Sequence, residues 1–217
     1  YGFIGGGRGN KVLCNSSFIG SGISNTVSGY YGSIVGGVAN SNSGYYSAIV
    51  GGTNNTISSG YDSIGFIGGG FYNKISSEKS SIVGGCRNLV SGNVSSIVGG
   101  SLNTSSAAYT FIGGGLRNIA SGTNSSVVGG ETNKAGGACD VVVGGRLNTA
   151  SGGFSFIGSG CDNSNSGYYG FIGGGSNNCV NNNRGIILGG YNNTVNGSAY
   201  NTIIGGLTNT ISSYKHN

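Results

Sequence analysis

An isoleucine or valine recurs along the whole chain at a nearly fixed interval, and two residues later comes a glycine pair followed by an asparagine. We call this aliphatic position slot 1 of a repeating unit. Slot 1 is Ile4, Ile19, Ile34, Ile49, Ile67, Ile82, Ile97, Ile112, Val127, Val142, Ile157, Ile172, Ile187 and Ile203. Slot 7 is Asn10, Asn25, Asn40, Asn55, Asn73, Asn88, Asn103, Asn118, Asn133, Asn148, Asn163, Asn178, Asn193 and Asn209. The asparagine spacing is 15 residues except for one interval of 18 and one of 16. A short fixed period of this kind predicts a solenoid, in which each coil stacks on its neighbours.

Slots 0 and 2 flank the aliphatic position and vary together. Where slot 0 is phenylalanine, slot 2 is glycine: Phe3/Gly5, Phe18/Gly20, Phe66/Gly68, Phe111/Gly113, Phe156/Gly158 and Phe171/Gly173. The other units pair them as Ser33/Val35, Ala48/Val50, Ser81/Val83, Ser96/Val98, Ser126/Val128, Val141/Val143, Ile186/Leu188 and Thr202/Ile204. Such an exchange keeps the filled volume roughly constant, as a packed interior requires. We therefore expect this strand to be buried on both faces, one inside the coil and one against another chain.

The rest of the unit predicts a second strand between two corners. Slots 3 and 4 are Gly-Gly or Ser-Gly, which is typical of a tight corner. Slot 7 (asparagine) and slot 9, which is usually aliphatic, should point inward, and slot 8, mostly Thr or Lys, outward. A Ser-Gly corner such as Ser91-Gly92 then closes the coil. We expect the asparagines to form a structural amide ladder.

These features predict an all-β parallel solenoid with about 15 residues in each of 14 coils. We expect one repeat domain over residues 1–217, with repeats starting near 3, 18, 33, 48, 66, 81, 96, 111, 126, 141, 156, 171, 186 and 202, and a C-terminal tail at 212–217. Because the sequence starts inside a unit, we expect it to derive from a longer polypeptide. A second architecture stays open. Phenylalanine at slot 0 of units 2, 5, 8 and 11 would also fit a wide single-chain helix with three repeats per turn.

Composition argues against nucleic-acid binding. Glycine supplies 49 residues, only 7% of residues are charged, and the net charge of +5 comes from scattered basic residues. A nucleic-acid surface needs a basic patch or stripe, which is missing. No apolar stretch is long enough to cross a bilayer, so we expect no membrane insertion by this segment. The five cysteines show no disulfide spacing, and we expect free thiols.

Catalysis is not expected. The only histidine is His216, beside the C-terminus, and the acids Asp62, Glu78, Glu131, Asp140 and Asp162 never share a slot on adjacent coils. Acid–base and nucleophilic mechanisms need such groups in pairs or triads. We expect no cofactor, no metal and no enzymatic activity.

The repeat Ser-Ser-Ile-Val-Gly-Gly-x-x-Asn-x-x-Ser-Gly, found around residues 81–92, resembles the head repeat of YadA-like trimeric autotransporter adhesins and related repeats in phage and large-virus fibres. This resemblance covers nearly the whole chain. It implies a left-handed parallel β-roll, three chains around a common axis, and a role as the exposed rod of a surface fibre, with an extracellular or virion-surface location. The period of 15 rather than 14, the doubled glycine and the alternation of Phe-Ile-Gly with Ser-Ile-Val depart from that family.

Tyrosines at the second corner are the best candidates for ligand contact. They are Tyr30, Tyr31, Tyr45, Tyr46, Tyr168 and Tyr169, with Tyr61, Tyr109, Tyr200 and Tyr214 nearby. Exposed aromatic rings with polar tips suit a glycan or protein on a host surface, and they equally suit packing over the corner glycines. We expect a structural or adhesive fibre segment whose partner is itself. The alternatives are a head-to-tail filament and an ice- or glycan-binding solenoid that uses the Thr positions of slot 8.

Overall fold

The computed structural model describes residues 1–58, 60 and 64–212, and all regular structure in this part of the chain is β-strand. The chain divides into two compact units, residues 1–109 and 110–217. The prediction of a parallel β-solenoid is confirmed: each unit carries seven turns, so that the chain has about 14. Tyr61, Asp62, Tyr214, His216 and most of the expected tail lie outside the described residues.

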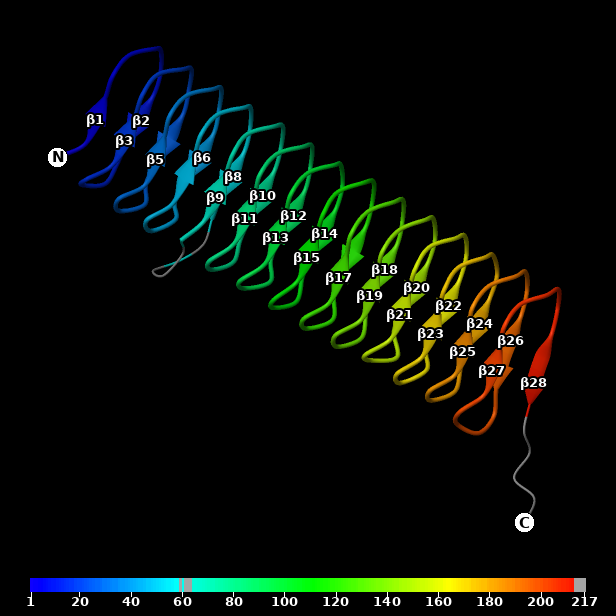
Figure 1. The fold of residues 1–217 in the computed structure, drawn as a ribbon. Coiled ribbons are helices and arrows are strands. Elements are labelled where there is room, and N and C mark those ends of the chain that lie inside the picture. Colours follow the sequence, from blue (N-terminus) through cyan, green and yellow to red (C-terminus); the bar gives the residue numbers. More distant parts are fainter. Residues whose placement is uncertain (59, 61–63, 213–217) are drawn as a thin grey trace. The chain divides into compact units, whose positions relative to one another are not determined.

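Unit 1 consists of two parallel sheets built from short strands on alternate sides of each coil (Figure 1). The first sheet holds β1 (Phe3–Ile4), β3 (Phe18–Ile19), β5 (Ser33–Ile34), β7 (Ala48–Ile49), β9 (Phe66–Ile67), β11 (Ser81–Ile82) and β13 (Ser96–Ile97). The second holds β2 (Lys11–Val12), β4 (Thr26–Val27), β6 (Ser41–Asn42), β8 (Thr56–Ile57), β10 (Lys74–Ile75), β12 (Leu89–Val90) and β14 (Thr104–Ser105). We call them the slot-1 sheet and the slot-9 sheet.

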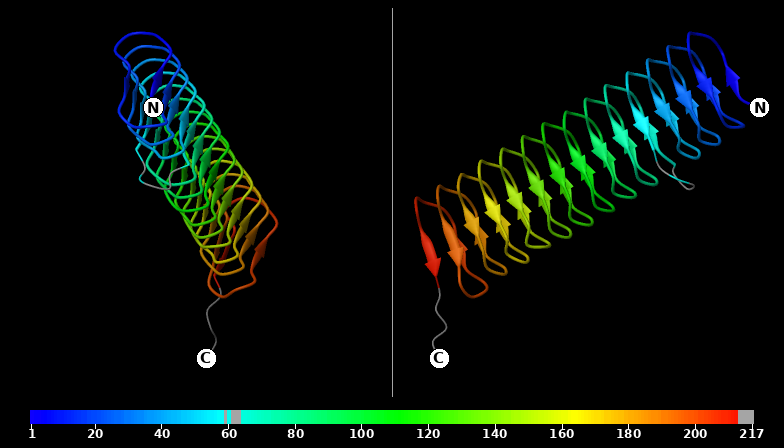
Figure 2. Two further views of the ribbon diagram at one scale, coloured as in Figure 1. Left: turned by 90° about the vertical axis from the view of Figure 1, so that its left-hand side faces the viewer. Right: turned by 180° about the vertical axis from the view of Figure 1, so that it is seen from behind.

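Unit 2 repeats this arrangement, as Figure 2 shows from two further sides. Its slot-1 sheet holds β15 (Phe111–Ile112), β17 (Ser126–Val127), β19 (Val141–Val142), β21 (Phe156–Ile157), β23 (Phe171–Ile172), β25 (Ile186–Ile187) and β27 (Thr202–Ile203). Its slot-9 sheet holds β16 (Ile119–Ala120), β18 (Lys134–Ala135), β20 (Thr149–Ala150), β22 (Ser164–Asn165), β24 (Cys179–Val180), β26 (Thr194–Asn196) and β28 (Thr210–Ser212).

The register shows that one repeat makes one turn. Phe3 pairs with Phe18 and Ile4 with Ile19 across the first two slot-1 strands, a shift of one repeat. Pairing continues at the same shift in both compact units, for example between Ile82 and Ile97 in unit 1. A wide helix with three repeats per turn would pair residues that are three repeats apart, so this alternative architecture is wrong. A third line of parallel bridges joins the slot-5 residues, beginning with Arg8 and Ile23.

The core is a column of aliphatic side chains inside each coil. Slot 1 is fully buried from Ile19 to Ile187, and the slot-9 side chains of Val27, Ile57 and Ile75 are also 0% exposed. Short strands cannot hold together by themselves, so this interior and the hydrogen bonds between coils stabilise the fold. The end positions Ile4 and Ile203 are more exposed, at 44% and 7%.

In most described coils both corners contain a residue with positive φ that is not glycine, which the sequence pattern did not reveal. At the first corner it precedes the asparagine, as in Ser24 and Leu102, and at the second it is a residue such as Tyr31 or Val94. In this conformation two successive backbone N–H groups point in opposite directions. The N–H of Ile23 donates to the carbonyl of Gly37 in the following coil, whereas the N–H of Ser24 donates to the carbonyl of Arg8 in the preceding coil. The corners therefore bind the neighbours on both sides, which offsets the strain of left-handed backbone.

Candidate functional site

The asparagine column seals the first corner. From Asn25 to Asn193 every slot-7 side chain is at most 1% exposed. Asn88 is representative: its Nδ2 donates to the carbonyls of Gly84 in its own coil (3.1 Å) and Gly100 in the next (3.0 Å). Its Oδ1 accepts the backbone N–H of Asn103 at 3.0 Å. The side chains thus bind mainly backbone groups of two coils and leave no free face for a ligand.

The outward face of the slot-1 sheet is apolar and open. We call it the outer apolar face and define it by slots 0 and 2. Its exposed fractions include 40% for Phe66, 53% for Val83 and 47% for Val128. None of the 28 slot-0 and slot-2 residues carries a charge, although the chain has 15 charged residues. Uncharged apolar surface of this extent is typical of an interaction site.

The glycine of slot 2 in the phenylalanine coils has close neighbours within one chain. An added Cβ on Gly68 would sit 3.5 Å from the Phe66 ring, an ordinary van der Waals contact. The same Cβ would approach the carbonyl oxygen of Val83 in the next coil to 2.3 Å, so a side chain at this position requires the backbone to shift. The expectation that another chain covers this face stays a prediction.

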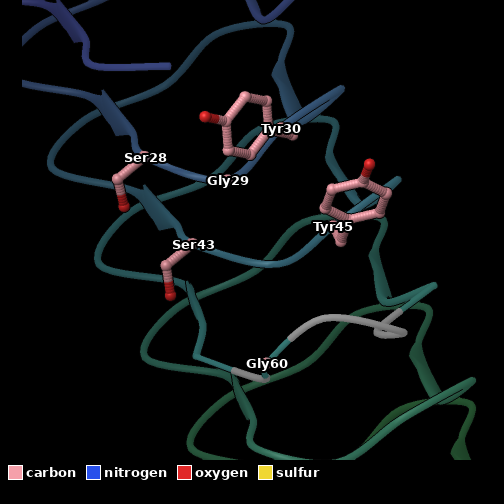
Figure 3. A pocket seen from close by; sticks show the side chains of 6 residues that line it. All are labelled: Ser28, Gly29, Tyr30, Ser43, Tyr45 and Gly60. Atoms are coloured by element: carbon pink, nitrogen blue, oxygen red, sulfur yellow. The ribbon is translucent and has the colours of Figure 1, made fainter. Parts of the chain in front are cut away.

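Four of the predicted ligand-contact tyrosines meet at the second corner of successive coils. The rings of Tyr31 and Tyr46 are stacked, with centroids 4.7 Å apart and planes inclined by 8°. Tyr45 packs edge-on against Tyr46 at 4.7 Å and lies 6.0 Å from Tyr30. Beside them is a groove of about 200 Å³ (Figure 3), lined by Ser28, Gly29, Tyr30, Ser43, Tyr45 and Gly60.

The other two predicted tyrosines belong to a second aromatic cluster, in unit 2. Tyr168 packs edge-on against Phe154 at 5.6 Å and against Tyr169 at 4.4 Å. The guanidinium of Arg184 lies 5.7 Å from the centroid of Tyr169 and 5.1 Å from that of Tyr200. A cation over aromatic rings adds roughly 0.5–1 kcal/mol at an exposed site, so this arrangement serves the packing of the corner.

The pKa values of Tyr45 and Tyr168, one in each cluster, are raised by different causes. Partial burial raises the pKa of Tyr45, and the neighbouring phenols of Tyr46, Tyr31 and Tyr30 raise it further. A hydrogen bond with Tyr169 raises the pKa of Tyr168, and partial burial adds to it. Both groups are therefore neutral donors and acceptors at physiological pH.

One buried acid, Asp140, was not singled out by the sequence pattern. It is 0% exposed and takes the place of the serines found at this slot in the neighbouring coils, Ser125 and Ser155. Its carboxylate accepts the N–H groups of Gly137, Gly153 and Ser155 and the Ser155 hydroxyl, at 2.6–3.0 Å. Because this carboxylate accepts four hydrogen bonds from two coils, it has a structural role.

Other chemistry is sparse in the described part of the chain. Within it, no three His, Cys, Asp or Glu residues lie close enough to hold a metal ion. All five cysteines are free and half-buried. Lys11, Lys74 and Lys134 are exposed in slot 8 and break the flat row of threonines that ice binding would use. No helix among the described residues could cross a bilayer.

Comparison with family models and with curated proteins finds no match to this chain.

Proposed function

We propose that this chain is a structural segment of a surface or virion fibre, in which three copies bury their outer apolar faces against one another. The resulting rod would space or display a binding surface and would have no catalytic role. Its partner is then a second and third copy of the same chain. The observation that carries the proposal is the outer apolar face, which is open in a single chain and contains no charged residue.

The size of this face suits self-association. A phenylalanine side chain offers about 200 Å² when fully exposed, so a ring exposed by 40%, as Phe66 is, leaves about 80 Å² open. Seven comparable coils expose roughly 500–600 Å² in each unit, the upper end for patches on monomers. The face of each unit alone is thus more than half of the ~800 Å² that each partner buries in a standard interface.

A second copy is the best-matched partner because it presents the same face with the same spacing between coils. Phenylalanine coils, which are bulky at slot 0, alternate irregularly with valine coils, which are bulky at slot 2. Symmetric copies in register would bring like coils to one level. The number three and the left-handed coil come from the resemblance to YadA-like head repeats, and an extracellular or virion-surface location follows from the same resemblance.

Placing a charge on each sheet tests this proposal. Val83 is 53% exposed in the single chain, so Val83→Asp should leave the fold intact. Burying that carboxylate between copies costs several kcal/mol, and we expect the variant to sediment as a monomer. The matched control is Thr104→Asp, on the outward side of the slot-9 sheet, which should sediment like the wild type.

Circular dichroism of both variants checks that the fold is retained. Equal masses for Val83→Asp, Thr104→Asp and the wild type would contradict the assignment of the interface.

A further inference from the structure

The groove at the second corner of unit 1 has two unlike sides. In Figure 3 the rings of Tyr30 and Tyr45 lie on one side, and the side chains of Ser28 and Ser43 line the other. The groove is open, and Tyr30 is 46% exposed. None of the six lining residues that the structure describes is charged. One side thus presents aromatic surface, and the other side carries the two serines.

The aromatic side is held in place by rings behind it. Tyr45 contacts Tyr31 at 5.7 Å and Tyr46 at 4.7 Å, both edge-on, while Tyr31 and Tyr46 stack face to face. Tyr31 and Tyr46 are also fixed by their backbone, because each has positive φ and Tyr46 donates its N–H to Tyr30. A ring that is already ordered loses little conformational entropy when a ligand binds, which favours recognition.

We propose that this groove binds a neutral carbohydrate through one sugar unit. The C–H face of a pyranose packs on an aromatic ring, and its hydroxyls need donors and acceptors close by. The hydroxyl of Ser43 donates to the carbonyl of Ile57 at 3.0 Å, so its oxygen is oriented to accept from a ligand. The volume of about 200 Å³ is below the roughly 300–1,000 Å³ of pockets for drug-sized molecules, which suits a single ring.

The described lining residues favour a neutral ligand. A phosphate, sulfate or uronic acid needs a cation or a set of N–H donors, and among the lining residues that the structure describes there is neither a lysine nor an arginine. The groove lies at the second corner and not on the outer apolar face. This site rests on the display role proposed above and gives it a ligand class, and it can be tested in a monomer or a trimer.

The test is an NMR titration of protein carrying ring-labelled tyrosine, with the methyl glycosides of glucose, galactose, mannose and N-acetylglucosamine added one at a time. The state of association is measured by light scattering on the same samples, so that failure of the trimer is seen separately. We expect at least one glycoside to shift the Tyr30 and Tyr45 ring signals saturably. The double variant Tyr30→Ala/Tyr45→Ala should weaken that binding at least tenfold.

Two further variants keep the result interpretable. Tyr30→Phe retains the ring and should bind within about threefold of the wild type, since stacking needs no phenol. Tyr168→Ala, in the aromatic cluster of unit 2, should leave the affinity unchanged. The proposal is overturned if none of the four glycosides gives a saturable shift, or if Tyr168→Ala weakens binding as much as the double variant does.

Discussion

Both corners of each coil turn the chain from one sheet to the other, but they use different residues to do so. At the first corner two positions do not vary: a positive-φ glycine such as Gly85 and an asparagine such as Asn88 recur in every unit, and the asparagine is buried from Asn25 to Asn193. At the second corner the left-handed residue is Tyr31 in one coil, Val94 in another and Arg184 in a third. Its side chain points away from the core, so its identity is free to change.

This difference separates the structural part of the repeat from the part available for function. The first corner is constrained because an asparagine side chain must reach two glycine carbonyls and the next backbone N–H. At the left-handed residue the second corner is closed by backbone hydrogen bonds, such as that from Val94 to Glu78, which any side chain permits. Substitution of the buried asparagine should therefore affect stability, and substitution of the left-handed residue of the second corner should affect surface properties.

The largest expected effect is that of Asn88→Leu. This change removes the donor to the Gly84 carbonyl and the acceptor of the Asn103 N–H, whereas the Gly100 carbonyl keeps the N–H of Cys86 as a donor. Each buried backbone group left unpaired costs about 1–3 kcal/mol, so we expect a loss of about 2–5 kcal/mol. Hydrogen exchange at the Asn103 amide should accelerate accordingly, and chemical denaturation should give the global loss.

The matched control is Asn93→Ala, at the second corner of the same coil. Asn93 is exposed, and its Oδ1 accepts the Glu78 N–H at 3.2 Å. Solvent replaces that bond, so we expect a change within about 0.5 kcal/mol. Comparable losses of stability for Asn88→Leu and Asn93→Ala would contradict the assignment of a structural role to the first-corner asparagine.

A smaller effect on stability is expected within the glycine pair, where the two neighbouring positions should respond differently to alanine. Gly85 has φ +98°, and an added Cβ would lie 2.2 Å from the carbonyl oxygen of Gly100. Gly84, its neighbour, has no heavy atom within 4 Å of that position. Gly85→Ala should cost about 2–4 kcal/mol. Gly84→Ala should be neutral or stabilising by up to about 1 kcal/mol, because alanine restricts the unfolded chain. The denaturation midpoints of the two variants, measured side by side, show whether only Gly85 requires glycine.

The smallest effect concerns the tyrosines of the second corner. The pKa of Tyr45 is raised in the folded chain by partial burial and by its phenol neighbours. A raised folded pKa means that this phenol's contribution to stability is complete below its ordinary pKa of about 10 and is lost as the pH rises through the folded value. An NMR titration of the Tyr45 ring should show a midpoint above 10, and Tyr46→Phe should lower it. A midpoint at or below this ordinary value would show that the rings are not packed together in solution.

Much of the fold could be predicted from periodicity because each slot has one dominant physical role. An aliphatic residue at slot 1 of every unit is explicable only by a shared buried position, and the burial of Ile82 and Ile97 follows. The positive φ of Leu102 and Val94 could not be predicted, because it arises from hydrogen bonds to the preceding coil and leaves no residue preference. The covariation of Phe66 with Gly68 was visible in the sequence, but the closeness of the Val83 carbonyl to Gly68 required the geometry.

The candidate site was predictable only in outline. Tyrosine pairs at the same slots of adjacent units predict rings side by side, as Tyr31 and Tyr46 are. The groove beside them could not be predicted, since it needs the serines of slot 10 and Gly60 in the coil of 18 residues. Asp140 looked like an isolated acid, because the N–H groups that surround it are invisible in a sequence.

The proposed fibre requires that other copies of the chain cover the outer apolar face in solution. Light scattering coupled to size-exclusion chromatography measures this directly on the wild-type protein. One chain has a mass of 21.4 kDa, so a homotrimer has three times that mass, about 64 kDa. We predict the larger value over the micromolar concentration range. A soluble, folded species of 21.4 kDa would contradict the proposal.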